Sequence, residues 1–67
     1  MDELEKRFTY HAPKGNQPER YQKMREWGLH VASFIQENCP DSLERSLAIT
    51  NLEQAIMWAN ASIARNE

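Results

Sequence analysis

The sequence predicts an all-α protein: an antiparallel helical hairpin with a short N-terminal helical arm, assembling as a homo-oligomer. Two long segments carry apolar residues at spacings of three and four, the period of an amphipathic helix. The turn-forming stretch NCPDS separates these segments, and only two Gly and three Pro occur among the 67 residues. This length allows one domain at most, so residues 1–67 are predicted to form a single helical-hairpin domain.

The N-terminal part is predicted to be an arm followed by a loop. Residues 1–8 contain DELEKRF, which fits a helix of about two turns. Residues 9–17 contain the start of PKGNQP, whose Pro, Gly and Asn residues are typical of a turn or loop.

The first long helix is predicted at residues 18–38, because Pro18 is well tolerated in the first turn of a helix. Its inner stripe consists of Tyr21, Met24, Gly28, Val31 and Ile35. Trp27 and Phe34, seven residues apart, form a second stripe beside it. Gly28 either permits close approach of a partner helix or is simply tolerated, at roughly 1 kcal/mol of helix propensity relative to Ala.

The second long helix is predicted at residues 41–66. Asp41 is the expected N-cap, and Glu44 three residues later completes a capping-box pattern. One broad apolar face consists of Ala48, Ile49, Leu52, Ala55, Ile56, Ala59 and Ile63. Leu47, Trp58 and Ala61 lie to one side of this face, so the helix is apolar on more than one side.

The surplus of apolar residues predicts self-association. A hairpin buries one stripe from each helix, so Trp27, Phe34, Leu47 and Trp58 should remain exposed and mark an interface. Small residues on the second helix would let helices approach closely: Ala48, Ala55, Ala59 and Ser62. Chains this short often need a disulfide, a metal or self-association, and a lone Cys39 allows no intrachain disulfide.

Composition and charge narrow the function classes. The formal net charge is −2, which disfavours a duplex DNA binder. No stretch approaches the roughly 20 apolar residues of a membrane span, and the charged start MDELEK does not resemble a signal peptide. The single cysteine suits a reducing cytosol. A soluble, intracellular protein is therefore expected.

The placement of the reactive side chains in the sequence predicts that the chain is not an enzyme. His11, His30 and Cys39 are scattered rather than grouped, so neither a metal site nor a nucleophile–base pair is indicated. PKGN is too short for a phosphate-binding glycine loop, and no cofactor is expected.

A cluster of cations and aromatics offers binding chemistry instead. Six of the eight basic residues lie between positions 6 and 25. Tyr10 and His11 could each stack on a nucleobase, an interaction of roughly 1–3 kcal/mol per base. Lys23 and Arg25 could hold phosphate. The alternatives are that Tyr10 packs the arm onto the hairpin and that the cations form an ordinary solvated face.

Three segments of the chain, RFTYHAP, ERYQKMR and ERSLAITNLEQAIMWANASIARN, resemble a known family. They are similar to phage anti-CBASS cyclic-nucleotide sponges of the second type, whose helical-hairpin domain also occurs in sponges that antagonise Thoeris defence. The resemblance implies a small helical homo-oligomer, typically a hexamer, acting in the cytoplasm of the infected bacterial host. Such a protein sequesters cyclic oligonucleotide messengers, such as cyclic GMP–AMP, without cleaving them.

The resemblance also implies residue roles. Tyr10 of YHAP matches the aromatic residue that stacks on a base of a cyclic dinucleotide, with His11 beside it. Arg25 is the first choice for the cation on the phosphates, and Lys23 is the second. Arg65 of IAR matches the arginine of a separate cyclic trinucleotide site. The family places a hydroxyl on the first long helix near that site, whereas this helix has no Ser or Thr before Ser33.

Other readings stay open at this point. A helical oligomer could occlude another protein, as an inhibitor or antitoxin-like protein does. A helix-turn-helix DNA binder ranks lowest, because the second helix is acidic at its start. The sequence leaves open the nucleotide preference, the number of protomers and whether the trinucleotide site is functional.

Overall fold

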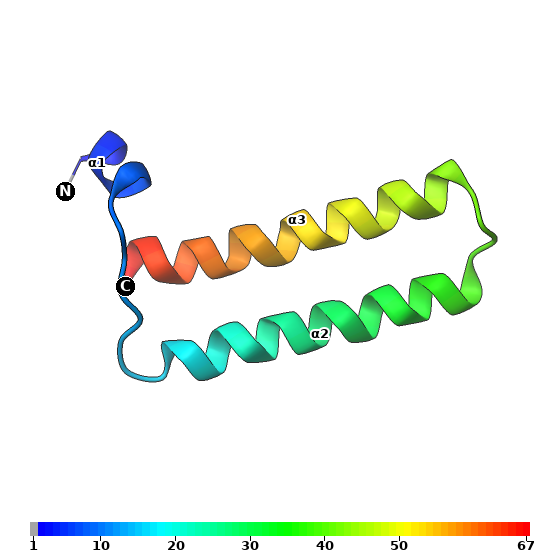
Figure 1. Ribbon diagram of the computed structural model, residues 1–67, viewed down its shortest axis with the longest axis horizontal. Coiled ribbons are helices and arrows are strands. Elements are labelled where there is room, and N and C mark those ends of the chain that lie inside the picture. The colour runs from blue at the N-terminus through cyan, green and yellow to red at the C-terminus, as the bar shows by residue number, and fades with distance from the viewer. Residues whose placement is uncertain (1) are drawn as a thin grey trace.

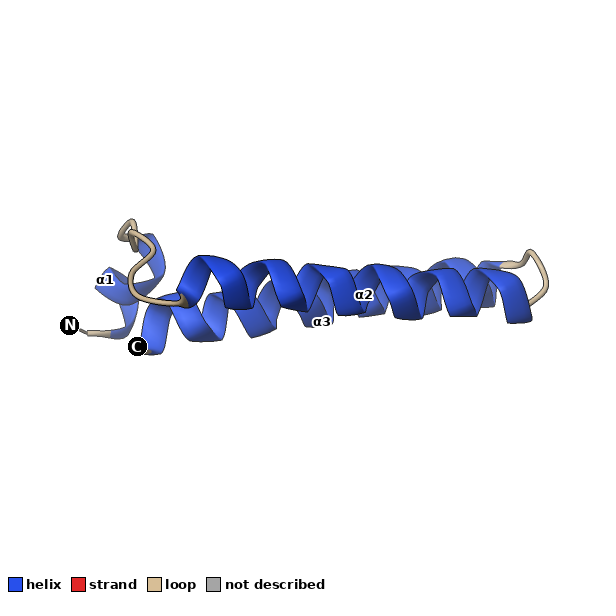
Figure 2. Ribbon diagram, turned by 90° about the horizontal axis from the view of Figure 1, so that it is seen from below, coloured by secondary structure: helices blue, strands red, loops and turns tan. Residues whose placement is uncertain are grey.

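Two long antiparallel helices make up most of the molecule (Figure 1), which we describe from a computed structural model covering residues 2–67. The elements are α1 (Glu3–Phe8), α2 (Gln17–Asn38) and α3 (Leu43–Asn66). No strand occurs within residues 2–67, so the predicted all-α hairpin with a short helical arm is confirmed. The two long helices form a single flat layer, seen edge-on in Figure 2, and the molecule measures 45 × 25 × 12 Å.

The arm helix α1 begins at a clear cap. The Asp2 side chain accepts a hydrogen bond from the Glu5 backbone N–H at 2.9 Å. Acidic residues in the first turn and basic residues in the last turn complement the helix dipole. Position 1 of the predicted arm lies outside the described residues. Because α1 has six residues and none of them is buried, it depends on contacts outside the helix.

Helix α2 begins at Gln17, one residue before the predicted start, with Pro18 in its first turn. It ends where the Cys39 backbone N–H donates to the Ile35 carbonyl at 2.9 Å. Pro40 follows and cannot continue the helical hydrogen bonding.

The predicted cap of α3 is wrong. Ser42, not Asp41, is the N-cap: its backbone is extended, and its hydroxyl accepts from the Arg45 backbone N–H at 3.1 Å. Asp41 lies outside the helix, and its carboxylate pairs with the Arg45 guanidinium at 3.1 Å. Since residue 45 is Arg, Glu44 cannot complete a capping box from Ser42. The helix therefore starts at Leu43, two residues later than predicted.

Helices α2 and α3 approach closely at Gly28. A Cβ atom at this position would lie 2.8 Å from Ile56 Cγ1, closer than such atoms normally approach. Of the two explanations for this glycine, the structure favours close approach. Gly15, by contrast, has a φ of +58° with nothing within 4 Å of a built Cβ, so it serves the turn before α2.

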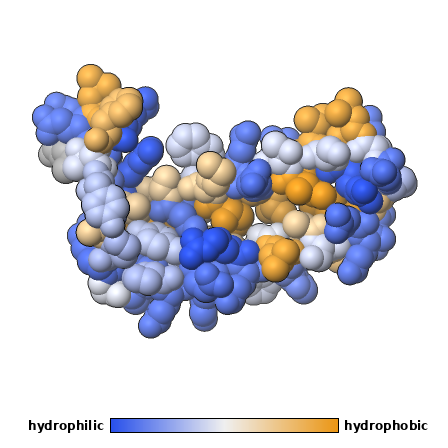
Figure 3. Space-filling view, viewed as in Figure 1, coloured by the Kyte–Doolittle hydropathy of each residue, from blue (hydrophilic) through white to orange (hydrophobic). Residues whose placement is uncertain are grey.

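The hairpin has almost no interior of its own. Within residues 2–67, Ile63 is the one buried apolar residue, at 8% exposure. Trp27, Phe34, Leu47 and Trp58 are 52–66% exposed, as the sequence predicts for a lone hairpin. Figure 3 shows hydrophobic surface along the seam between the helices and at the start of α3.

Candidate functional site

A shallow hollow brings His11 of the loop and Arg25 of α2 together. Its volume is about 280 Å³, and its lining comes from the loop, α2 and α3. The lining residues are His11, Tyr21, Arg25, Asn60, Ala61 and Ala64. Two of the four residues predicted for cyclic dinucleotide binding therefore share one concave surface.

The His11 ring is oriented by the arm. Its Nε2 lies 2.7 Å from the Lys6 carbonyl oxygen. Because a carbonyl only accepts, Nε2 must carry the proton, and in the neutral ring Nδ1 is then an acceptor. This hydrogen bond therefore fixes both the orientation of the half-buried ring and the nitrogen that acts as donor.

Tyr10 projects into solvent. It is 83% exposed and does not line the hollow that contains its neighbour His11. The alternative that Tyr10 packs the arm onto the hairpin is wrong for this chain, because such packing would bury the ring.

The side chains of Arg25 and Lys23 lie on different surfaces of the molecule. Two residues along a helix are separated by about 200°, so their side chains leave opposite sides of α2. Lys23 lines a separate hollow of about 350 Å³ with Glu26, Trp27 and His30, where the Trp27 and His30 rings meet edge-on at 6.0 Å. Of these two cations, only Arg25 lines the hollow of His11.

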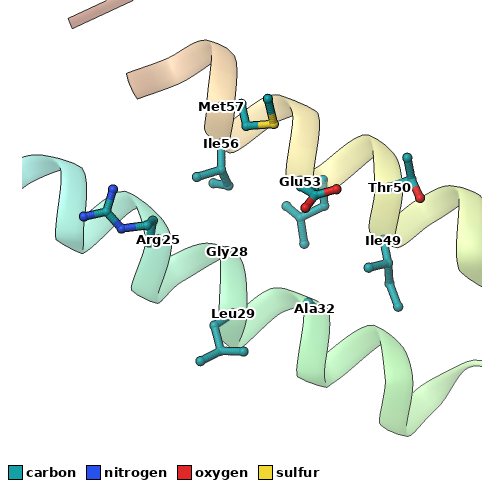
Figure 4. Close-up of a pocket in the computed structure, with 10 residues that line it drawn as sticks. Arg25, Gly28, Leu29, Ala32, Ile49, Thr50, Glu53, Ile56 and Met57 are labelled. Atoms are coloured by element: carbon teal, nitrogen blue, oxygen red, sulfur yellow. The ribbon is translucent and has the colours of Figure 1, made fainter. Parts of the chain in front are cut away.

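Arg25 also lines a second, larger groove. This groove, of about 440 Å³, runs between α2 and α3 and is mostly apolar. Figure 4 shows Ile49 and Ile56 pointing from α3 toward α2, with Gly28 facing them and Arg25 at one end. Its polar lining residues are Arg25, Thr50 and Glu53, so it carries a carboxylate as well as a cation.

Arg65 lies at a third place, beside the arm. It shares a hollow of about 230 Å³ with Glu3, Lys6 and Trp58, among other residues. Its guanidinium carbon is 6.0 Å from the centre of a Trp58 ring, at the outer limit of a cation–π contact. Arg65 is therefore separate from the hollow of His11 and Arg25.

The cation cluster divides into two groups. Arg7 pairs with Glu3 at 3.1 Å, Lys6 lies 4.0 Å from Glu3, and Arg20 pairs with Glu67 at 2.7 Å. Within residues 2–67, neither Lys23 nor Arg25 lies within 4.0 Å of a carboxylate. Lys14 donates to the Glu67 backbone oxygen. Lys23 and Arg25 are therefore the cations of the cluster without a contact to an acidic residue in this range, and Arg25 donates one hydrogen bond to Gln22 Oε1 at 3.2 Å.

Sequence reasoning did not identify Asn60. Its Oδ1 is buried without a hydrogen-bond partner in the described chain, and its Nδ2 makes a long contact of 3.5 Å to the Tyr21 carbonyl. Asn60 lies four residues after Ile56 and three before Ile63, so it occupies a position on the apolar stripe. This polar break in the periodicity was the available signal.

A second missed group surrounds Glu67. Arg20 donates two hydrogen bonds to its carboxylate, at 2.8 and 2.7 Å, and Gln17 Nε2 donates a third at 3.2 Å. These hydrogen bonds, from Arg20 first and Gln17 second, lower the pKa of Glu67, and the same contact raises the pKa of Arg20. The Lys14 ammonium donates to the Glu67 backbone oxygen at 2.6 Å. No single-helix pattern connects these residues.

Residues 2–67 contain no side-chain cluster typical of a metal site and no helix typical of a membrane span. No group of three or more His, Cys, Asp and Glu side chains is placed to hold a metal ion. No helix in this range combines the length and the apolar composition that crossing a membrane requires.

Comparison with known proteins places the chain in a family. The domain described as "Acb2/Tad1, hairpin domain" matches residues 1–64. A search of curated proteins and a search of solved structures gave no match. The matched segment includes the arm, the loop, α2 and nearly all of α3, and with it every residue of the hollow. The chain therefore belongs to the Acb2/Tad1 hairpin family of anti-CBASS 2 and Thoeris-antagonist sponges, a family of cyclic-nucleotide binders rather than enzymes.

Proposed function

We propose that this protein sequesters cyclic dinucleotides, such as cyclic GMP–AMP, without cleaving them and so blocks CBASS signalling in the cytoplasm of an infected bacterium. The observation that carries the proposal is the hollow that joins His11 to Arg25, which has no ion pair within residues 2–67, next to the exposed Tyr10. A flat ring and a planar cation supply the two contacts that a nucleotide needs: stacking on a base and a fork for phosphate oxygens.

The pocket is completed by a second copy of the chain. A cyclic dinucleotide carries two bases and two phosphates, whereas one chain offers one Arg25 and one exposed Tyr10. A two-fold pair of protomers would present one set from each side of the ligand. The exposed apolar residues support this association, because a hairpin with a single buried apolar residue gains little from folding alone. The assembly we expect is a hexamer.

Arg25 is the phosphate contact in this proposal, and Lys23 is not. The support is geometric, since Arg25 shares the hollow with His11 while Lys23 lines another surface with Glu26. A cyclic trinucleotide site at Arg65 is the second part of the proposal. Lys6 and Trp58 line the same hollow as Arg65 and add a second cation and an aromatic ring.

Isothermal titration with cyclic GMP–AMP tests this function. We expect tight binding by the wild type, about tenfold or greater loss on Tyr10→Ala because stacking contributes roughly 1–3 kcal/mol per base, and a comparable loss on Arg25→Ala. Lys23→Ala is the matched control and should bind like the wild type. After heat denaturation of the complex, chromatography should recover the ligand intact.

Other outcomes would redirect the assignment. A degraded ligand would indicate an enzyme. No binding to any cyclic di- or trinucleotide would favour the alternative function, a protein–protein inhibitor or antitoxin-like protein, for which the exposed Trp27, Phe34 and Leu47 offer an apolar contact surface.

A further inference from the structure

The segment that carries Tyr10 and His11 is attached to the hairpin mainly by polar contacts. Helix α1 buries none of its residues, and its apolar side chains Leu4 and Phe8 are both exposed. Apolar packing therefore does little to place this segment relative to α2 and α3. Ligand residues must hold their positions to bind well, so other contacts must fix the position of this segment.

One set of contacts joins the end of the loop to the end of α3. The Lys14 backbone N–H donates to Gln17 Oε1 at 3.1 Å, and Gln17 Nε2 donates to Glu67 Oε1 at 3.2 Å. Gln17 is only 3% exposed, so this amide is a fixed bridge between the loop and the carboxylate. Arg20 engages the same carboxylate with both of its terminal nitrogens.

A second set joins the beginning of the loop to the same end of α3. The Lys6 ammonium donates to Asn66 Oδ1 at 3.1 Å, while the Lys6 carbonyl accepts from the His11 ring at 2.7 Å. Residues 66 and 67 thus contact the chain on both sides of the stretch 9–13. Within the described chain, the bidentate Arg20–Glu67 pair is the contact with the most favourable geometry.

We propose that Glu67 is a positioning residue for the ligand site: by clasping Lys14, Gln17 and Arg20, it holds the loop so that His11 faces Arg25 and Tyr10 stays next to their hollow. The clasp itself stands on the contacts above, and its effect on ligand affinity rests on the proposed function. Glu67 does not touch the hollow of His11 and Arg25, so its influence on binding would be indirect.

The first measurement requires no ligand. Backbone amide order parameters from nuclear magnetic resonance would be compared for the wild type, Glu67→Ala and Glu37→Ala. Glu37 is the matched control, an exposed carboxylate on α2 for which the structure shows no ion pair within residues 2–67. For the amides of residues 10–12 and 14, Glu67→Ala should lower the order parameters from about 0.85 toward 0.6 or below, which marks flexible backbone. The Gly28 and Ile56 amides should not change.

The second measurement is a mutant cycle on cyclic GMP–AMP affinity. If the loosened loop holds the competent arrangement about one third of the time, Glu67→Ala raises the apparent dissociation constant about threefold. Arg20→Ala should have a similar effect, and Arg20→Ala in a Glu67→Ala background should add little, because the clasp is already open.

The outcomes separate the two proposals. Unchanged order parameters in Glu67→Ala would overturn the clasp, and so would an Arg20→Ala effect that is equally large with and without Glu67, since Arg20 would then contact the ligand directly. If the loop loosens as expected but the wild type binds no cyclic nucleotide, the clasp stands and the proposed function fails.

Discussion

Gly28 offers the most direct test of how the two long helices meet. In Gly28→Ala, the new Cβ would lie 2.8 Å from Ile56 Cγ1 and 3.3 Å from Ile56 Cδ1. Ile56 is β-branched and sits in a helix, where one χ1 rotamer is strongly preferred, so Cγ1 cannot easily move away. Overpacking of this kind costs typically 1–3 kcal/mol, against a gain of about 1 kcal/mol in helix propensity. We expect a net destabilisation of about 1 kcal/mol.

The sign of this effect should reverse when the opposing side chain is removed. Ile56→Ala eliminates Cγ1 and Cδ1 and leaves Cβ, which would be 3.8 Å from the new methyl group, an ordinary contact. In the Ile56→Ala background, Gly28→Ala should therefore stabilise the protein by about 1 kcal/mol, the propensity gain alone. The coupling between the two positions would be about 2 kcal/mol, within the range for residues in contact.

Urea unfolding followed by circular dichroism measures these differences. All variants should be compared at one protomer concentration, because association adds to apparent stability. Gly15→Ala is the matched control: it is destabilised by its positive φ rather than by crowding, so it should be additive with Ile56→Ala. If Gly28→Ala stabilises the protein in both backgrounds, the helices do not meet where the structure places them.

Three further predictions follow from the same contacts. Ser42→Ala should destabilise the fold by about 1 kcal/mol, with a much smaller effect for Asp41→Ala, measured by the same urea titration. The folded-state pKa of Glu67 is below its ordinary value of 4.5, so its contribution is complete above that pH and is lost as the pH falls through the lowered pKa. Because the facing cations stay charged at acidic pH, the amides of residues 10–12 and 14 should lose order on acidification in the wild type but much less in Glu67→Gln. Sedimentation equilibrium should show an oligomer that dissociates when Phe34 and Leu47 are both replaced by Ser; a wild-type monomer at micromolar concentration would contradict the association.

The helices could be predicted from the sequence because their signals are local. Apolar spacing, Pro18 and the NCPDS break together locate α2 and α3 to within two residues. The cap of α3 could not be read in the same way, because both Asp41 and Ser42 are good capping residues. The choice depends on which of them adopts an extended backbone directly before the helix, and Ser42 does.

Less of the site could be predicted from the sequence, because its contacts join residues on different helices and on the loop. Tyr10 and His11 are adjacent in sequence, yet only His11 lines the hollow with Arg25. The Arg20–Glu67 pair joins residues 47 positions apart, and their meeting depends on the register between α2 and α3. That register is set by packing at Gly28 and Ile56, which no single-helix pattern specifies.

The uneven distribution of charge has a physical explanation in two parts. Lys6 attaches the arm to Asn66 and Lys14 attaches the loop to Glu67. Two other clustered cations form ion pairs: Arg7 with Glu3 inside the arm, and Arg20 with Glu67. These contacts compensate positive charge within the chain, whereas Arg25 on the hollow has no ion pair in the described part of the chain. One such cation and one exposed ring cannot neutralise and stack a ligand with two phosphates and two bases. The same chain also leaves large apolar side chains in water, so a second copy would complete the ligand site and cover the apolar surface at once.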